Sequence, residues 1–145
     1  MAHTYTLNLL HIVFSTKNRL PKIPSLSALL KNLRGIARNK NMDLLAGGGT
    51  TNHVHLLLHL PLVRSLSDAV RDLKANSSRY MNEKRRGFAW QDGYAALSVS
   101  PSQVETVKRY IETQDEHHAK RGFEAEYVAL LDKSGMQHSA EYVFG

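Results

Sequence analysis

Two histidines, His53 and His55, are separated by one apolar residue in the stretch TNHVHLLLHL (residues 51–60). Residues two apart in a strand point to the same side, with Cα atoms about 6.6–7 Å apart. Both imidazoles could therefore reach one divalent cation, whereas His59 lies about 13 Å from His55, which is too far. Such a site needs a third protein ligand and leaves positions for water or substrate. The alternative interpretation is a polar pair on the solvated face of a sheet.

A second pair with chemical potential is Tyr110 and Gln114, in the charged segment VKRYIETQDEHH (residues 107–118). At helical spacing i and i+4, the phenol and the amide are neighbours. A tyrosine can attack a phosphodiester and hold the severed DNA end as a phosphotyrosine. Because its ordinary pKa is near 10, it needs a base or a cation on the phosphate, and the Gln114 amide oxygen could position that cation. Alternatively, Tyr110 is a core-edge aromatic beside a solvated amide.

Basic residues could supply the surface for a polyanion. The chain of 145 residues has 19 Lys+Arg against 13 Asp+Glu, a formal charge of +6, which favours nucleic acid as partner. The candidate phosphate contacts are Lys17, Arg19, Arg71, Lys74, Arg79, Lys84, Arg85 and Arg86. Phe88 and Trp90, beside the last of these, could stack on unpaired bases, although Trp90 is also interpretable as a core aromatic.

Length and composition restrict the class of protein. We expect one domain over residues 1–145, since domains commonly hold about 100–150 residues. A hydrophobic fraction of 42% excludes a disordered chain, and 0 Cys excludes disulfide scaffolds and thiol chemistry. No apolar run approaches the about 18 residues of a membrane span, and the first residues lack the features of a signal peptide. We therefore expect a cytoplasmic protein.

The elements that must position these residues follow from hydrophobic periodicity. We expect strands at 5–14, 42–46, 51–60 and 94–99, and helices at about 25–40, 65–86, 101–122 and 123–133. The glycines at 47–49 are expected to form a flexible turn. This order predicts an α+β, ferredoxin-like (split βαβ) antiparallel sheet with helices mostly on one face, plus C-terminal helices carrying the tyrosine. The alternate residues of the histidine strand, Val54, Leu56, Leu58 and Leu60, are expected to pack on the helices.

Together these motifs resemble the single-tyrosine HUH transposases of bacterial insertion sequences (transposase A type), which are close to REP-associated tyrosine transposases. The resemblance extends from HIVFSTKNR (residues 11–19), through the histidine strand and WQDGYAALSVS (residues 90–100), to EYVALLDKSGM (residues 126–136). It implies a DNA transposase that cleaves and rejoins single-stranded DNA at the hairpin ends of an insertion sequence.

The resemblance also assigns roles to residues of this chain. It implies that His53, His55 and Gln114 hold a divalent metal ion, Mg²⁺ or Mn²⁺, and that Tyr110 forms a 5′-phosphotyrosine and releases a 3′-OH. It implies a homodimer, often with the tyrosine helix of one subunit completing the histidine site of the other. For His117 two interpretations stay open: it assists the metal ion or the phosphate, or it is an ordinary packed or solvent-exposed residue. No special role is expected for His3, His11, His59, His118 and His138, nor for Tyr5, Tyr80, Tyr94, Tyr127 and Tyr142 as nucleophiles.

Two other functions remain open on the sequence alone. One is a domesticated protein that binds single-stranded or hairpin DNA without cleaving it. The other is a metal hydrolase that uses the histidine pair with a water nucleophile, which leaves Tyr110 unexplained. Formation of a covalent protein–DNA adduct separates these possibilities from the transposase.

Overall fold

A four-stranded antiparallel sheet forms the centre of the computed structural model, which describes residues 3–114 and 122–136. Its strands, in the spatial order β2-β3-β1-β4, are β1 (Leu9–Ser15), β2 (Asp43–Gly49), β3 (His53–His59) and β4 (Ala95–Val99). The helix α1 (Leu26–Asn39) connects β1 to β2, and α2 (Leu66–Lys84) connects β3 to β4. This β-α-β-β-α-β arrangement confirms the predicted α+β, ferredoxin-like fold.

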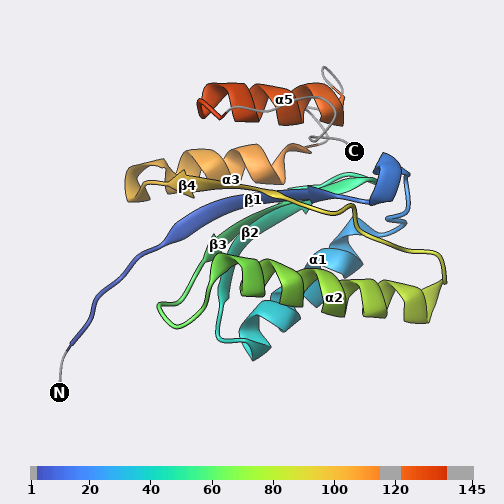
Figure 1. Ribbon diagram of the computed structural model, residues 1–145, viewed down its shortest axis with the longest axis horizontal. Coiled ribbons are helices and arrows are strands. Elements are labelled where there is room, and N and C mark those ends of the chain that lie inside the picture. The colour runs from blue at the N-terminus through green and yellow to red at the C-terminus, as the bar shows by residue number, and fades with distance from the viewer. Residues whose placement is uncertain (1–2, 115–121, 137–145) are drawn as a thin grey trace.

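One face of the sheet is covered by α1 and α2 (Figure 1). The side chains of Val54, Leu56 and Leu58 point to this face because they alternate along β3. They pack with apolar residues of both helices, including Leu33 and Leu73, which are 0% exposed. Burying each such side chain contributes about 1.5–3 kcal/mol, so this layer is the main apolar core. The predicted packing of the apolar stripe of β3 is confirmed.

The opposite face of the sheet is covered by α3 (Val104–Glu112) and α5 (Phe123–Lys133), which form a third layer (Figure 1). Ile111 of α3 packs on the sheet at Leu57, and Phe123 of α5 packs at Val13. The prediction that the helices lie mostly on one face is therefore wrong. Apolar residues on both faces of β1 and β3 require cover on both sides, and the C-terminal helices provide it.

Several element boundaries differ from the prediction. The strand β1 begins at Leu9 rather than at residue 5, and Tyr5 is 91% exposed. The short helix η1 (Lys17–Arg19) follows β1, and η2 (Pro101–Gln103) precedes α3. The α3 helix ends at Glu112, and the predicted continuation over 115–121 lies outside the described residues. Of the helices described, none is both long and apolar enough for a bilayer crossing.

Candidate functional site

The two histidines of β3 lie on the face that α3 and α5 cover. His53 and His55 point to the same side, as predicted, with ring centroids 5.1 Å apart. Both are 0% exposed, so the alternative of a solvated polar pair is wrong. They are buried because α3 and α5 pack over this face of the sheet, and the periodicity of a strand does not reveal such packing. A buried polar pair must be satisfied by specific partners.

The neighbours of His53 determine which of its ring nitrogens faces the site. Asn52 donates from Nδ2 to the backbone oxygen of Arg19 (3.3 Å), which leaves its Oδ1 2.9 Å from His53 Nδ1. The hydroxyl of Thr50 also donates to this Oδ1 (3.1 Å). Since Oδ1 is an acceptor, His53 Nδ1 carries the proton that it accepts. The other ring nitrogen of His53, Nε2, therefore points into the site.

Gln114 lies against this nitrogen. Its Nε2 donates to the backbone oxygen of Tyr110 (3.2 Å), and its Oε1 lies 3.2 Å from His53 Nε2. The side chain is buried, at 1% exposed. A proton on His53 Nε2 makes this contact a hydrogen bond, and a cation bound by both atoms would take the place of that proton. The predicted grouping of His53, His55 and Gln114 is present in the structure.

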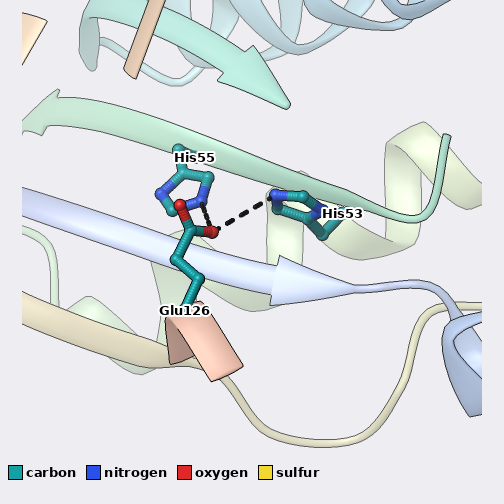
Figure 2. A group of neighbouring side chains, drawn as sticks. All are labelled: His53, His55 and Glu126. Atoms are coloured by element: carbon teal, nitrogen blue, oxygen red, sulfur yellow. Dashed lines mark hydrogen bonds and ion pairs between the residues drawn. The ribbon is translucent and has the colours of Figure 1, made fainter. Parts of the chain in front are cut away.

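Glu126 of α5, which was not among the predicted site residues, also lies in the site. One carboxylate oxygen, Oε1, lies 3.0 Å from His55 Nε2 and 3.6 Å from His53 Nε2 (Figure 2). One potential ligand atom from each of these three residues lies within 4.8 Å of the others. The carboxylate and amide oxygens suit Mg²⁺ or Mn²⁺, and imidazole nitrogens suit divalent transition metals, so the residues present fit a divalent ion without selecting one metal.

The spacing of residues in α5 could have indicated from the sequence that Glu126 is buried. One face of this helix packs on the sheet, and it carries Phe123, Glu126, Tyr127 and Leu130. A carboxylate is rarely buried on an apolar face unless it is paired. Burial by itself raises the pKa of Glu126, but the hydrogen bond and charge of His55, with smaller contributions from Tyr110 and His53, bring it to about 2. Glu126 is therefore ionised at neutral pH.

The phenol of Tyr110 meets the same carboxylate. Its hydroxyl donates to Glu126 Oε2 at 2.5 Å, and its ring centroid lies 5.7 Å from that of His55. The predicted nucleophile and the predicted metal ligands therefore belong to one cluster, formed within a single chain. The Glu126 carboxylate lies between the phenol and the two imidazoles and contacts both.

The position of α3 depends on Gly48 of β2. A Cβ atom added to Gly48 would lie 1.8 Å from the backbone oxygen of Ile111, so only glycine permits this contact between helix and strand. Tyr110 precedes Ile111 and is carried to the histidines by the same packing. The expectation that residues 47–49 form a flexible turn is wrong, because they are paired with β3. The turn lies at residues 50–52.

His11 of β1 contacts His55, although no special role was predicted for it from the sequence. It is 4% exposed, and its Nε2 lies 2.8 Å from His55 Nδ1. Burial, with the charge of His55, lowers its pKa to about 3, while Glu126 acts in the opposite direction. This hydrogen bond fixes the orientation of the His55 ring.

The lowered pKa of His11 predicts how stability depends on pH. The folded state binds fewer protons than the unfolded state between pH 3 and 6.5, so the free energy of unfolding falls as the pH falls through this window. The expected slope is at most about 1.4 kcal/mol per pH unit. Urea unfolding of the chain in EDTA between pH 4.5 and 6.5, above the window in which Glu126 contributes, measures it. His11→Gln should flatten the slope, and an unchanged slope contradicts this role.

Lys17 and Arg19, two of the predicted phosphate contacts, lie on η1 at the end of the sheet where β3 begins. The amide of Thr16, just before η1, donates to the backbone oxygen of Asn52 (2.9 Å), which places η1 beside the histidine strand. Lys17 is exposed. The Nε atom of Arg19 pairs with Glu124 Oε1 of α5 at 2.7 Å.

The other predicted phosphate contacts belong to α2 or follow it, across the sheet from the histidines. They are Arg71, Lys74, Arg79, Lys84, Arg85 and Arg86. Lys74 donates to the backbone oxygens of Gln91 (2.8 Å) and Gly93 (2.6 Å), and burial lowers its pKa. It therefore holds a loop, whereas Lys84, Arg85 and Arg86 are exposed and border a pocket of about 560 Å³.

The two aromatic residues beside this basic run are buried. Trp90 is 9% exposed, donates from Nε1 to Ser77 Oγ (3.0 Å) and packs edge-on to Phe14. The core interpretation of Trp90 is confirmed, so base stacking on it is ruled out in this structure. Phe88 is 7% exposed and forms part of the wall of the basic pocket. His117 and His118 lie outside the described residues.

Comparison with known proteins also identifies transposases as similar proteins. Residues 4–114 match the family of IS200-like transposases. The ISDra2 transposase TnpA of Deinococcus radiodurans is 31% identical over 90 residues, which are 57% of this chain and 64% of that protein. The matched part thus spans slightly less than two-thirds of that relative's length.

Two solved structures have a similar fold. A candidate transposase from Deinococcus radiodurans R1 superposes with a TM-score of 0.62 at 27% identity, over 79% of this chain and 96% of the other. A REP-associated tyrosine transposase bound to a REP hairpin superposes with a TM-score of 0.60 at 15% identity, over 85% of this chain and 74% of the other. At the latter identity the likeness concerns the fold alone.

Proposed function

This chain belongs to the family of IS200-like transposases, and we propose that it cleaves and rejoins single-stranded DNA at the hairpin ends of an insertion sequence. The observation that carries this proposal is the meeting of Tyr110 with His53, His55 and Gln114 in one buried cluster. A domesticated DNA-binding protein has no need of such a cluster, and a hydrolase with a water nucleophile has no need of its tyrosine.

In the proposed reaction, the Tyr110 hydroxyl oxygen attacks the scissile phosphorus. The bond from phosphorus to the 3′ oxygen breaks, the phenolic proton leaves, and the departing 3′ oxygen takes up a proton as a 3′-OH. The 5′-phosphate stays esterified to Tyr110. Because this link keeps the phosphoester energy, a second 3′-OH can attack it and rejoin the strands without ATP.

We propose that His53, His55 and Gln114 hold a divalent ion, Mg²⁺ or Mn²⁺. Such an ion, when bound, polarises the phosphate and stabilises the charge that develops on it. The 3.2 Å approach of His53 Nε2 to Gln114 Oε1, two atoms that can both ligate a cation, supports this assignment. The residues around the ion contribute orientation: Asn52 fixes the ring of His53, and His11 fixes that of His55.

We propose that the DNA lies along the end of the sheet that bears η1 and the end of α2. Lys17, Lys84, Arg85 and Arg86 are exposed there and would contact phosphates without reading sequence. Gln114 lines a groove of about 500 Å³ along β2, which would admit the scissile strand to the cluster. The hairpin bound to the REP-associated relative supports a structured DNA end as the partner.

We propose that the protein acts as a homodimer in the cytoplasm. A twofold dimer is the commonest symmetric assembly. Within the described residues, Tyr110 contacts the site of its own chain, so dimerisation is proposed here for holding two DNA ends rather than for completing the site.

The protein should form a covalent adduct with hairpin-ended single-stranded DNA in Mn²⁺ or Mg²⁺, visible as a shifted band on a denaturing gel. EDTA should abolish the adduct because it removes the metal ion, and excess Mn²⁺ should restore the adduct because the metal site is then occupied again. A double-stranded oligonucleotide of the same composition serves as control. Binding without any adduct would favour the domesticated DNA-binding protein.

A further inference from the structure

We propose that Glu126 is itself a ligand of the divalent ion and that its second oxygen holds the Tyr110 phenol beside that ion. This inference rests on the metal site of the proposed function and adds to it a residue from a different element. Glu126 belongs to α5 and lies beyond residues 4–114, over which the family match extends.

The two oxygens of the Glu126 carboxylate have different neighbours. Oε1 lies 3.0 Å from His55 Nε2 and 3.6 Å from His53 Nε2 (Figure 2). Oε2 accepts the Tyr110 hydroxyl at 2.5 Å. A single carboxylate therefore spans from the histidine pair to the nucleophile, and an ion held by Oε1 would have the phenol oxygen in its immediate surroundings.

Burial and charge favour a metal ligand over a merely structural carboxylate. Glu126 is 4% exposed, and the two imidazoles beside Oε1 are 0% exposed. His55 Nε2, His53 Nε2 and the Gln114 amide oxygen converge on this region, with His53 Nε2 3.2 Å from Gln114 Oε1 and His55 Nε2 3.0 Å from Glu126 Oε1. Protons on the imidazoles bridge these contacts in the absence of metal, and a divalent cation bound by the same atoms takes the place of those protons.

The chemistry of the donors points to the same role. Two imidazoles and an amide carry no negative charge, so they leave the charge of a divalent ion uncompensated in a buried site. One carboxylate compensates half of that charge, and hard ions such as Mg²⁺ and Mn²⁺ prefer carboxylate oxygens. Removing Glu126 should therefore weaken ion binding more than removing a neutral residue from the same surroundings would.

The test is direct binding of Mn²⁺ without DNA, followed by the electron paramagnetic resonance signal of the free ion. Glu126→Gln keeps the size of the side chain and removes its charge, and it should weaken Mn²⁺ binding by at least about tenfold. Glu124→Gln is the matched control, because it removes an exposed carboxylate from the same helix, two residues earlier. Its Mn²⁺ affinity should equal that of the wild type.

A third variant separates this inference from the proposed function. If His53→Ala abolishes Mn²⁺ binding while Glu126→Gln binds like the wild type, the metal site stands and the role of Glu126 is wrong. If His53→Ala binds Mn²⁺ like the wild type, the metal site itself is wrong. Circular dichroism checks that each variant folds. Should Glu126→Gln not fold, Glu126→Leu replaces it, because an apolar side chain fits the apolar face of α5, and wild-type Mn²⁺ affinity of that variant would equally overturn the inference.

The contact with Tyr110 adds a readout that a purely structural role would not change. At saturating Mn²⁺, Glu126→Gln should slow single-turnover adduct formation by at least about tenfold while the affinity for the hairpin stays that of the wild type. Glu126→Asp, which retains the charge, should recover part of the rate. An unaltered rate in Glu126→Gln at saturating Mn²⁺ would overturn the positioning of Tyr110.

Discussion

Replacing Tyr110 by phenylalanine should abolish the covalent adduct with hairpin-ended DNA, lowering its rate of formation by at least about 10⁴-fold. The substitution removes one oxygen atom, which is the proposed nucleophile, and leaves the ring that packs edge-on to His55. Affinity for the hairpin and for Mn²⁺ should stay close to that of the wild type. The adduct is quantified on a denaturing gel, and hairpin affinity is measured by fluorescence anisotropy.

Tyr127 offers the matched control for this variant. It lies on α5, packs on Phe123 and is half-buried, and burial raises its pKa. Tyr127→Phe removes the same atom from a neighbouring aromatic residue, so the adduct should form at the wild-type rate. Metal-dependent cleavage that persists in Tyr110→Phe would instead identify a hydrolase with a water nucleophile. Loss of the adduct in Tyr127→Phe but not in Tyr110→Phe would reassign the nucleophile.

Adding a single methyl group at Gly48 should be strongly disruptive. The new Cβ would lie 1.8 Å from the backbone oxygen of Ile111, and a backbone atom cannot move aside as a flexible side chain can. We expect Gly48→Ala to lower the free energy of unfolding by about 3 kcal/mol, at the upper end of the usual effect of overpacking. Displacing α3 also displaces Tyr110, so adduct formation should fall even where the variant remains folded.

Gly35 provides the control for the substitution at Gly48. It lies within α1, and a Cβ atom there would meet no atom within 4 Å. Gly35→Ala should therefore raise the free energy of unfolding by about 0.5–1 kcal/mol, because alanine has the higher helix propensity. Urea unfolding of both variants provides the comparison. If both variants have the same free energy of unfolding, or if Gly48→Ala forms the adduct at the wild-type rate, the position of α3 does not depend on the close contact between Gly48 and Ile111.

Much of the fold could be predicted because it depends on local periodicity. The alternation along β3 correctly placed Leu56 on one face and His53 with His55 on the other. The Ser25 and Ser65 side chains accept hydrogen bonds from the amides of Ala28 and Asp68, as residues at helix starts do. Periodicity did not reveal the cover on the second face, because a strand pattern does not state which helix will pack against it.

The residues that are missing from the predicted site were also missed because local sequence patterns do not reveal contacts between distant segments. Gln114 was found because it lies four residues from Tyr110, within reach of a local rule. Glu126 and His11 contact His55 across separations of 71 and 44 residues, and no local rule connects them. Gly48 was assigned to a turn because its composition favours one, whereas its function is to admit the backbone of α3.

The sequence alone determined the ferredoxin-like order of elements, the shared face of His53 and His55, and the pairing of Tyr110 with Gln114. These depend on residues a few positions apart, whose relative directions follow from strand and helix geometry. Only the tertiary structure decided that the histidines are buried, that Glu126 joins them to the tyrosine, and that His11 stands behind His55. Those contacts arise where α3 and α5 pack on the sheet, and packing between distant segments depends on the complementary shape of whole surfaces.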